Sequence, residues 1–361
     1  MNILLVTMEM NIGGAETHIL ELAKELKKQK NEVSVISAGG SLVPELEENG
    51  VVHIYAPLKD KKPKHVLDSF NIIKKTIVEK KIDVVHAHAR IPGAICGYVC
   101  KKLKVHFVTT IHGVYRVNFL LKKITNWGEK ALAVSEDIRE YAINEYKLNP
   151  DNIKVTVNGI NLEKFKKQEI FEDLDLKLDN KRKKIIHVSR LDKESSKVAE
   201  NLIDISGELE KELKNGVDII IVGSGNYIDD LKQKAQCCKN VIFTGARNDV
   251  EKLLNMADVF VGVSRAALEA MATELPVILA GNPEYGQGYQ GLFNKEELEL
   301  AKSTNFTCRG LEKIEKEILK KDILSALEKD VKTIGEYNRS IVREYYSVEK
   351  MTSDALQLYK F

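Results

Sequence analysis

The sequence predicts an α/β protein with two doubly wound, Rossmann-like domains that face each other across a cleft. Three observations lead to this fold class. Short runs rich in β-branched residues alternate with amphipathic segments along most of the 361 residues. These runs are apolar almost throughout, as expected for parallel strands covered by helices on both faces. The alternation pauses once, at the polar and charged residues 162–184, and a chain of this length has room for two or three domains.

The first half holds the candidate strands of a first domain, residues 1–161. They are NILLVT, EVSVIS, VVHIYA, DVVHAH, HFVTTIH, ALAVS and IKVTVN. Between the first two, Ile19, Leu22, Ala23 and Leu26 follow the spacing of a helical stripe. We therefore expect strands and helices to alternate in this domain.

The second half repeats this pattern over residues 185–335. Its candidate strands are IIHVSR, DIIIVGSG, NVIFTG, DVFVGVS and PVILAG. Residues 162–184 are expected to connect the two domains. Residues 336–361 carry no strand signal and are expected to form a C-terminal helix. Because open parallel sheets bind ligands at the carboxyl ends of their strands, the residues after each strand are the candidates for a site.

Composition narrows the functional classes. The five cysteines, Cys96, Cys100, Cys237, Cys238 and Cys308, form no CxxC pair and no zinc-type spacing, which favours a reduced, cytoplasmic protein. The start, MNILLVTMEM, is not typical of a signal peptide, and no apolar run is long enough to span a bilayer. The 55 basic and 53 acidic residues nearly balance, and we expect no nucleic-acid partner.

Charge is distributed unevenly along the chain. Residues 1–164 carry 24 basic and 19 acidic residues, a net charge of +5, so an anionic partner is expected on the first domain. Lysines accompany apolar residues at 58–65, 99–106 and 118–127. The last cluster combines Phe119, Leu120, Leu121, Ile124 and Trp127 with Lys122 and Lys123.

Such a mixture suits the interface of an anionic membrane. The alternative for each cluster is a surface helix that packs its apolar side on its own sheet. The three clusters together favour weak, reversible association with the inner membrane face.

Two glycines, Gly13 and Gly14, follow the first strand and open the first helix. Backbone amides at a helix start attract anions, and glycine lets a ligand approach closely. A tight turn between strand and helix explains them equally well.

Three histidines lie at strand ends. His86 and His88 share one face of a strand. A metal pair is conceivable, but no carboxylate or thiol has a convincing ligand spacing, so we expect buried or hydrogen-bonded histidines and no metal site. His112, which precedes a glycine, is expected in the cleft.

Basic residues and glycines follow the strands of the second half. Arg190 ends HVSR, with Lys193 and Lys197 close behind it. Arginine suits phosphate because its planar fork is permanently charged, although a solvated turn is the alternative. Gly223 and Gly225 follow the next strand, where a ligand or a tight turn would need glycine, and FTGARND places Arg247 after the strand beyond.

The stretch SRAALEAMA begins a further helix. The amides of Arg265, Ala266, Ala267 and Leu268 are candidates to cap a phosphate or sugar hydroxyls. Glu269, one turn in, is a candidate to accept hydrogen bonds from a diol such as a ribose. The alternative is an acid that only complements the helix dipole.

In their order along the chain, these motifs resemble a family 4 glycosyltransferase of the GT-B fold. The matching stretches are NIGGAETHILELAKEL, DVVHAH, TTIHG, ALAVSEDIRE, VTVNGI, HVSRLDK, IIIVGSGN, VIFTGARNDV, ADVFVG and LEAMATELPVI. They cover most of residues 1–280. The resemblance also implies that the C-terminal helix packs back on the first domain.

The resemblance implies roles for individual residues. Arg190 would neutralise the donor diphosphate, and Glu269 would hold the nucleotide ribose as the second glutamate of an E-x7-E motif. Gly13 and Gly14 would form the loop that faces donor phosphate and acceptor. His112 would lie near the transferred sugar.

Two positions depart from the family pattern. The first glutamate of E-x7-E would fall at Val261, which puts the donor sugar in doubt. The phosphate lysine would fall at Ser195, and Lys193 and Lys197 are the candidates to replace it.

The resemblance implies a retaining, metal-independent transferase that uses a nucleotide-diphosphate sugar and no cofactor. The acceptor would be a glycan, a lipid-linked or a small molecule, as in cell-envelope synthesis. Two alternatives stay open: a sugar-nucleotide epimerase on the same fold, and a non-catalytic sugar-nucleotide-binding protein.

Overall fold

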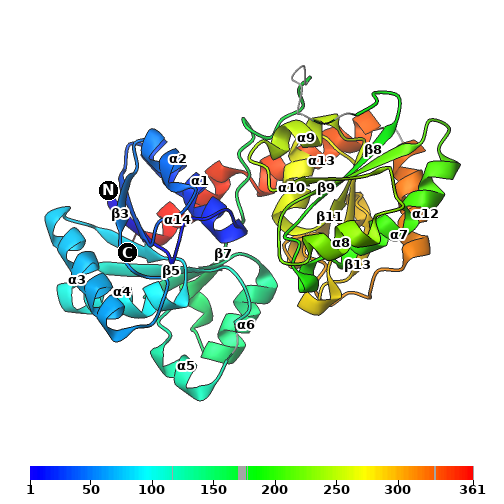
Figure 1. Cartoon of the computed structure of the whole chain (residues 1–361). Coiled ribbons are helices and arrows are strands. Elements are labelled where there is room, and N and C mark those ends of the chain that lie inside the picture. Colours follow the sequence, from blue (N-terminus) through cyan, green and yellow to red (C-terminus); the bar gives the residue numbers. More distant parts are fainter. Residues whose placement is uncertain (116, 170–175, 177, 329–330, 361) are drawn as a thin grey trace. The chain divides into compact units, whose positions relative to one another are not determined.

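The computed structural model describes residues 1–115, 117–169, 176, 178–328 and 331–360. The chain forms two compact units (Figure 1). Unit 1 comprises Met1–Gly159 and Tyr346–Phe361, and unit 2 comprises Ile160–Tyr345. Each unit is built around one sheet.

Unit 1 contains a seven-stranded parallel sheet of order β3-β2-β1-β4-β5-β6-β7. Its strands are β1 Asn2–Val6, β2 Glu32–Ser37, β3 Val52–Tyr55, β4 Val84–Ala87, β5 His106–Ile111, β6 Lys130–Ala133 and β7 Ile153–Val155. Its helices are α1 Gly14–Lys28, α2 Val43–Glu48, α3 Pro63–Glu79, α4 Arg90–Leu103, α5 Phe119–Ile124, α6 Glu136–Tyr146 and α14 Val348–Leu358, with the short 3-10 helix η1 Pro150–Asn152. All seven predicted strands of the first half are confirmed.

Alternation along β1 distributes the core of unit 1 over both faces of the sheet. Ile3 and Leu5 pack with residues of α1 and α14, whereas Leu4 and Val6 pack with residues of α3 and α4. Because successive side chains of a strand point to opposite faces, an unbroken apolar strand requires helices on both sides.

Unit 2 contains a six-stranded sheet of order β10-β9-β8-β11-β12-β13. Its strands are β8 Lys183–Val188, β9 Val217–Val222, β10 Val241–Gly245, β11 Val259–Gly262, β12 Val277–Ala280 and β13 Tyr289–Leu292. Its helices are α7 Lys197–Glu212, α8 Ile228–Lys234, α9 Val250–Met256, α10 Ser264–Ala272, α11 Leu298–Ser303, α12 Lys316–Glu328 and α13 Val331–Tyr345, with the 3-10 helices η2 Lys193–Ser195, η3 Pro283–Tyr285 and η4 Lys295–Glu297. The five predicted strands are confirmed, and the antiparallel edge strand β13 was not predicted.

The structure corrects two predicted boundaries. Residues 162–184, of which 170–175 and 177 lie outside the described residues, were predicted as a separate connection. Unit 2 instead begins at Ile160, and the early part is tied to it: the Phe165 carbonyl oxygen accepts Arg339 Nη1 at 2.9 Å, and Asn255 Oδ1 accepts the Gln168 amide at 2.9 Å. The second domain therefore starts earlier than its first strand.

The predicted single C-terminal helix over 336–361 is also wrong. The tail consists of α13, which packs against α10 of unit 2, and α14, which packs against α1 of unit 1. They separate at Tyr346, and Ser347 caps α14 by accepting the Lys350 amide at 3.3 Å. Only the segment from Tyr346 onward belongs to unit 1.

Within the described ranges, no helix is both long and apolar enough to cross a bilayer.

Candidate active site

The site residues of unit 2 follow the carboxyl ends of its strands. β8 ends at Val188, and the side chain of Arg190 just beyond it is 67% exposed. The Nε atom of Arg190 lies 3.9 Å from Oδ2 of Asp192, at the outer limit of an ion pair. The guanidinium therefore presents its charge to solvent at the sheet edge, where it can meet an anion.

Ser195 fixes the loop that carries Arg190. Its hydroxyl donates to the Arg190 carbonyl oxygen at 2.7 Å and accepts the Asp192 amide at 3.2 Å. From the other side, Asp192 Oδ1 accepts the amide of Asn226 at 3.0 Å. Ser195 is 5% exposed, a poor setting for the charged lysine expected at this position. The serine has a structural role there.

The two predicted replacements for that lysine differ in their surroundings. Lys193 is exposed at the start of η2, on the Arg190 loop itself. Lys197 opens α7, and its Nζ lies 3.3 Å from Oε2 of Glu200 in the same helix. Lys193 is therefore better placed to reach a phosphate.

The glycines after β9 serve close packing. Gly223 has a φ of +143°, and a side chain on it would collide with the carbonyl oxygen of Ser189. A side chain on Gly225 would collide with the backbone of Leu191. The tight-turn alternative accounts for both glycines, and donor binding by Gly223 stays a prediction.

Arg247 is engaged by its neighbour. Its Nε and Nη2 donate to the two carboxylate oxygens of Asp249 at 2.8 and 2.6 Å, and this bond is the largest cause of the lowered pKa of Asp249. A donor phosphate would have to compete with Asp249 for this guanidinium. The predicted donor contact of Arg247 is not tested by this geometry.

Glu269 and Arg265 form an ion pair inside α10. Arg265 Nε lies 2.8 Å from Glu269 Oε1, and the side chains are 11% and 13% exposed. An acid that only complemented the helix dipole would not need to be so enclosed. The ion pair with Arg265 fixes the orientation of the Glu269 carboxylate.

Fewer of the predicted backbone amides lie at the start of α10 than expected. The sequence pointed to Arg265, Ala266, Ala267 and Leu268, but α10 begins at Ser264. The Leu268 amide therefore lies one turn inside the helix, where helical carbonyls take the amides. Ala267 and Leu268 are also fully buried. Arg265 and Ala266 remain as first-turn candidates.

The surroundings of Val261 explain why the first glutamate of the E-x7-E motif is absent. Val261 is fully buried in the apolar core of unit 2, together with Ile185 and Ile219. Its carbonyl oxygen accepts Nδ1 of His187 at 2.8 Å. A carboxylate would be unfavourable among these side chains, so this position supplies no sugar contact.

A loop that sequence reasoning passed over supports the start of α10. The Phe306 carbonyl oxygen accepts the Ser264 amide at 2.6 Å. Ser264, Asn305, Phe306 and Cys308 all have φ between +55° and +61°, a strained region for residues other than glycine. The asparagine in STNFTCRG is the sequence feature that could have indicated this loop, because asparagine tolerates a positive φ.

In unit 1, the two glycines open α1. Gly13 caps the helix in an extended conformation, and a side chain on it would collide with the Glu16 carboxylate. Among the described residues, nothing lies within 4 Å of a side chain added to Gly14. A ligand could approach Gly14, but the carboxylate of Glu16 makes this helix start less attractive to phosphate.

His112 belongs to a cluster with His88 and His18. β4 and β5 are neighbours, so the residues after them, His88 and His112, meet with His88 Nδ1 3.1 Å from His112 Nε2. The His18 ring, from α1, lies edge-on to His112 with ring centroids 4.9 Å apart. Burial lowers the pKa of His112 to about 4 and, together with the neighbouring histidines, lowers the pKa of His88. Sequence reasoning missed His18.

His86 lies beside this cluster, with its ring centroid 4.2 Å from that of His88, but its two nitrogens make other contacts. Its Nδ1 contacts the Tyr359 hydroxyl and its Nε2 the Thr110 hydroxyl, both at 2.7 Å. Both ring nitrogens are used and the residue is fully buried, so the predicted structural role is confirmed. His88 is buried and hydrogen-bonded as predicted, but it also joins the cluster at the sheet edge.

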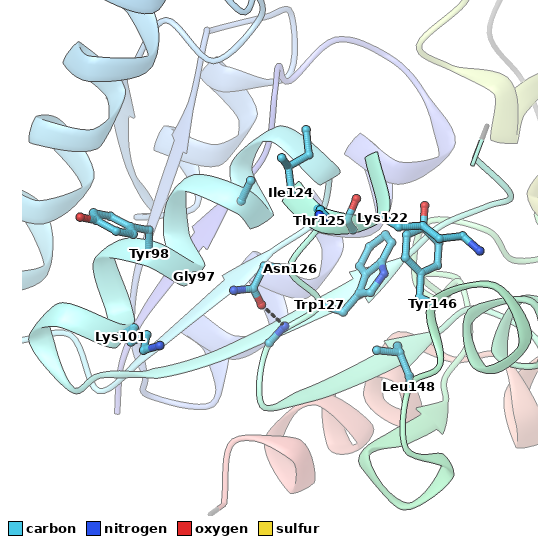
Figure 2. Close-up of a pocket in the computed structure, with 13 residues that line it drawn as sticks. Gly97, Tyr98, Lys101, Lys122, Ile124, Thr125, Asn126, Trp127, Tyr146 and Leu148 are labelled. Carbon is cyan, nitrogen blue, oxygen red and sulfur yellow. Dashed lines mark hydrogen bonds between the residues drawn. The ribbon is translucent and has the colours of Figure 1, made fainter. Parts of the chain in front are cut away.

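A separate pocket of about 420 Å³ lies on the flank of unit 1, between α4, α5 and the loop after α5 (Figure 2). Figure 2 shows Tyr98 and Lys101 from α4, Lys122 from α5, and Asn126, whose Oδ1 accepts the Gly128 amide at 2.9 Å. The pocket offers lysine and amide groups on an exposed face.

The structure divides the apolar residues predicted for a membrane surface. Phe119 and Ile124 are 76% and 54% exposed, whereas Trp127 is 5% exposed and packs between Tyr115 and Tyr146. Trp127 is therefore core, contrary to the prediction, and the side chain of Leu120 lies outside the described part. In the clusters at 58–65 and 99–106, Leu58, Val99 and Cys100 are likewise buried.

Comparisons with known proteins agree with this arrangement. Residues 12–164 match Glycosyltransferase Family 4, and residues 182–309 match Glycosyl transferases group 1. The alpha-monoglucosyldiacylglycerol synthase of Streptococcus pneumoniae is 25% identical over 75% of this chain and 69% of its own length. The N-acetyl-alpha-D-glucosaminyl L-malate synthase of Bacillus anthracis is 24% identical over 98% and 95%. Anabaena HepE, solved in complex with UDP-glucose, has 17% identity and a TM-score of 0.74, with all of both chains covered.

Proposed function

The chain belongs to glycosyltransferase family 4, and from this premise we propose that it moves a sugar from a nucleoside-diphosphate donor to an acceptor of envelope polysaccharide or glycolipid synthesis, with retention of configuration. The fold is that of GT-B glycosyltransferases. A relative named for a glucosyldiacylglycerol product and a fold neighbour solved with UDP-glucose support a lipid or glycan acceptor and a uridine donor.

The position of Arg190 carries this proposal. It is an exposed guanidinium at the carboxyl end of β8, on a loop held by Ser195 and Asn226. Preorganised positive charge is what a departing diphosphate needs, and an arginine offers it in a geometry that matches phosphate oxygens.

We propose the following reaction. The bond from the anomeric carbon to the β-phosphate oxygen breaks, and its electron pair leaves with the diphosphate. The acceptor oxygen forms the new bond on the same face, and its proton passes to a diphosphate oxygen. Arg190 stabilises the charge on the leaving group, with Lys193 beside it, and Glu269 binds the ribose hydroxyls. His112 keeps its proposed place near the transferred sugar, and neither a metal nor a cofactor is required.

A donor panel tests the function. The purified protein is incubated with UDP-glucose and UDP-N-acetylglucosamine without acceptor, and nucleotide release and sugar configuration are followed by NMR. We expect slow release of UDP with retention of the anomeric configuration. An epimerised sugar nucleotide would indicate the epimerase, and saturable binding without turnover would indicate a sugar-nucleotide-binding protein.

Glu269→Gln is expected to weaken UDP binding by about 1.5–3 kcal/mol, roughly 10- to 150-fold in Kd. The amide keeps the size of the side chain but loses the charge that strengthens bonds to the ribose hydroxyls. Calorimetry measures the affinity, and Glu284→Gln, an exposed acid on η3, is the matched control. Equal affinities in Glu269→Gln and the parent protein would mean that Glu269 does not bind the ribose.

We also propose that unit 1 associates weakly with anionic membranes through α5. Exposed Phe119 and Ile124 stand beside exposed Lys122 and Lys123, and Lys123 Nζ lies 4.4 Å from the centre of the Phe119 ring. Apolar groups next to lysines suit the boundary between headgroups and acyl chains, and a lipid acceptor would be met there.

Lys122→Gln/Lys123→Gln is expected to reduce flotation with anionic vesicles at low salt, because each lysine near such a surface contributes about 1 kcal/mol. Neutral vesicles and physiological salt should reduce flotation of the parent protein in the same way. Lys74→Gln/Lys75→Gln on α3 is the control. If the parent protein does not float with anionic vesicles even at low salt, the membrane proposal fails and a soluble acceptor is favoured.

A further inference from the structure

We propose that His18, His88 and His112 form a binding site for a divalent transition-metal ion that prefers imidazole ligands, such as Zn²⁺. One ring nitrogen from each histidine lies within 4.8 Å of the others. The three side chains come from α1 and from the ends of β4 and β5, three elements far apart in the sequence and held together by the sheet of unit 1.

The closest pair already has the spacing of two ligands on one ion. Zinc binds imidazole nitrogen at about 2.0–2.1 Å in tetrahedral geometry, which places two ligand nitrogens roughly 3.3 Å apart. His88 Nδ1 and His112 Nε2 are 3.1 Å apart. A proton now joins these two nitrogens, and a metal ion would replace it with little movement of either ring.

The third ring is oriented as a ligand. His18 Nδ1 lies 3.3 Å from Oδ1 of Asn158, and an amide oxygen can only accept. Nδ1 of His18 therefore carries the proton, and Nε2 is the atom of this ring that would serve as the ligand. Hydrogen bonds of this kind fix the tautomer of metal-binding histidines.

Burial supports the same conclusion. His18 and His88 are 1% and 2% exposed, so packing fixes their rings.

The ligand set selects the ion and limits its role. Three imidazoles suit zinc, nickel or cobalt, whereas magnesium and calcium prefer oxygen ligands. Three neutral ligands leave the charge of the ion uncompensated and a fourth position open. Because His112 is placed near the transferred sugar, a bound ion would compete with the donor and inhibit turnover. This consequence rests on the proposed function; binding of the ion does not.

Cobalt titration of the full-length protein tests the site. We expect one Co²⁺ per chain, detected by its visible absorption bands and displaced by Zn²⁺. His18→Gln and His112→Gln should each weaken binding about tenfold or more. His106→Gln, an exposed histidine paired with Glu129, should leave it unchanged.

Folding of each variant is followed by the fluorescence of Trp127, which is buried in the same unit. Absence of saturable binding in the parent protein, or binding that both folded variants retain, would overturn the proposal. The titration contains neither donor nor acceptor, and the donor panel contains no metal, so the two proposals fail independently.

Discussion

Arg190→Ala lowers kcat/KM for the nucleotide sugar by an expected 2–4 kcal/mol of transition-state stabilisation, roughly 30- to 1,000-fold. The alanine removes the exposed charge at the end of β8. It leaves the loop intact, because Ser195 and Asp192 hold that loop through the backbone of residues 190 and 192. The loss should appear mainly in kcat, since negative charge on the diphosphate grows as the sugar departs.

Two further variants sharpen this prediction. Arg190→Lys keeps the charge but not the planar fork, so it should recover only part of the loss. Arg343→Ala removes an exposed arginine from α13 and should behave like the parent protein. Unchanged kcat/KM in folded Arg190→Ala would remove Arg190 from the reaction and, with it, the main support for the proposed function.

The strands of both sheets could be predicted because burial on both faces leaves an unbroken apolar run. Residues 219–222 of β9 are buried throughout, and their sequence, IIIV, is wholly apolar. β13 could not be found in this way. It contains Gln290 and Gly291, pairs antiparallel at the sheet edge, and has one fully enclosed residue in four. An edge strand draws its stability from backbone pairing, which leaves little trace in the sequence.

The positions of the site residues could be predicted, but their partners could not. A motif places Glu269 in the first turns of a helix, but whether the carboxylate meets Arg265 depends on rotamers and on the enclosure of both side chains. The same holds for Arg247 and Asp249. Ser195 stands where the family resemblance implied a lysine. In the folded chain its hydroxyl instead holds the Arg190 loop.

His18 shows a different limit. It lies in an amphipathic helix, where a buried histidine is read as part of the packing face. Its partners follow strands about 70 and 94 residues later, and only the sheet order β1-β4-β5 brings the three together. Once the strand order is known, the sequence numbers of all three residues point to the same sheet edge.

His187 is expected to make the free energy of unfolding of unit 2 fall as the pH falls. It is fully buried beneath the Arg190 loop, with Nδ1 2.8 Å from the Val261 carbonyl oxygen and Nε2 2.8 Å from the Ser189 hydroxyl. The carbonyl oxygen can only accept, so Nδ1 carries the proton and Nε2 accepts from the Ser189 hydroxyl. Burial lowers the pKa of His187 from 6.5 to about 4.

Acidification from pH 7 to pH 4 is therefore expected to remove about 3 kcal/mol from the free energy of unfolding of unit 2. Between the unfolded and folded pKa values, the unfolded chain binds a proton that the folded chain does not, so stability falls as the pH falls.

Far-UV circular dichroism during urea unfolding reports both units, whereas Trp127 fluorescence reports unit 1 alone. His86 and His112 also have lowered pKa values, so the fluorescence transition should shift in acid as well. The glutamine in His187→Gln cannot titrate, so this variant should show a weaker acid dependence in the dichroism, with the contribution of unit 1 remaining, and an unchanged fluorescence shift. An equally steep acid dependence in the dichroism of His187→Gln would mean that His187 is not the group that titrates.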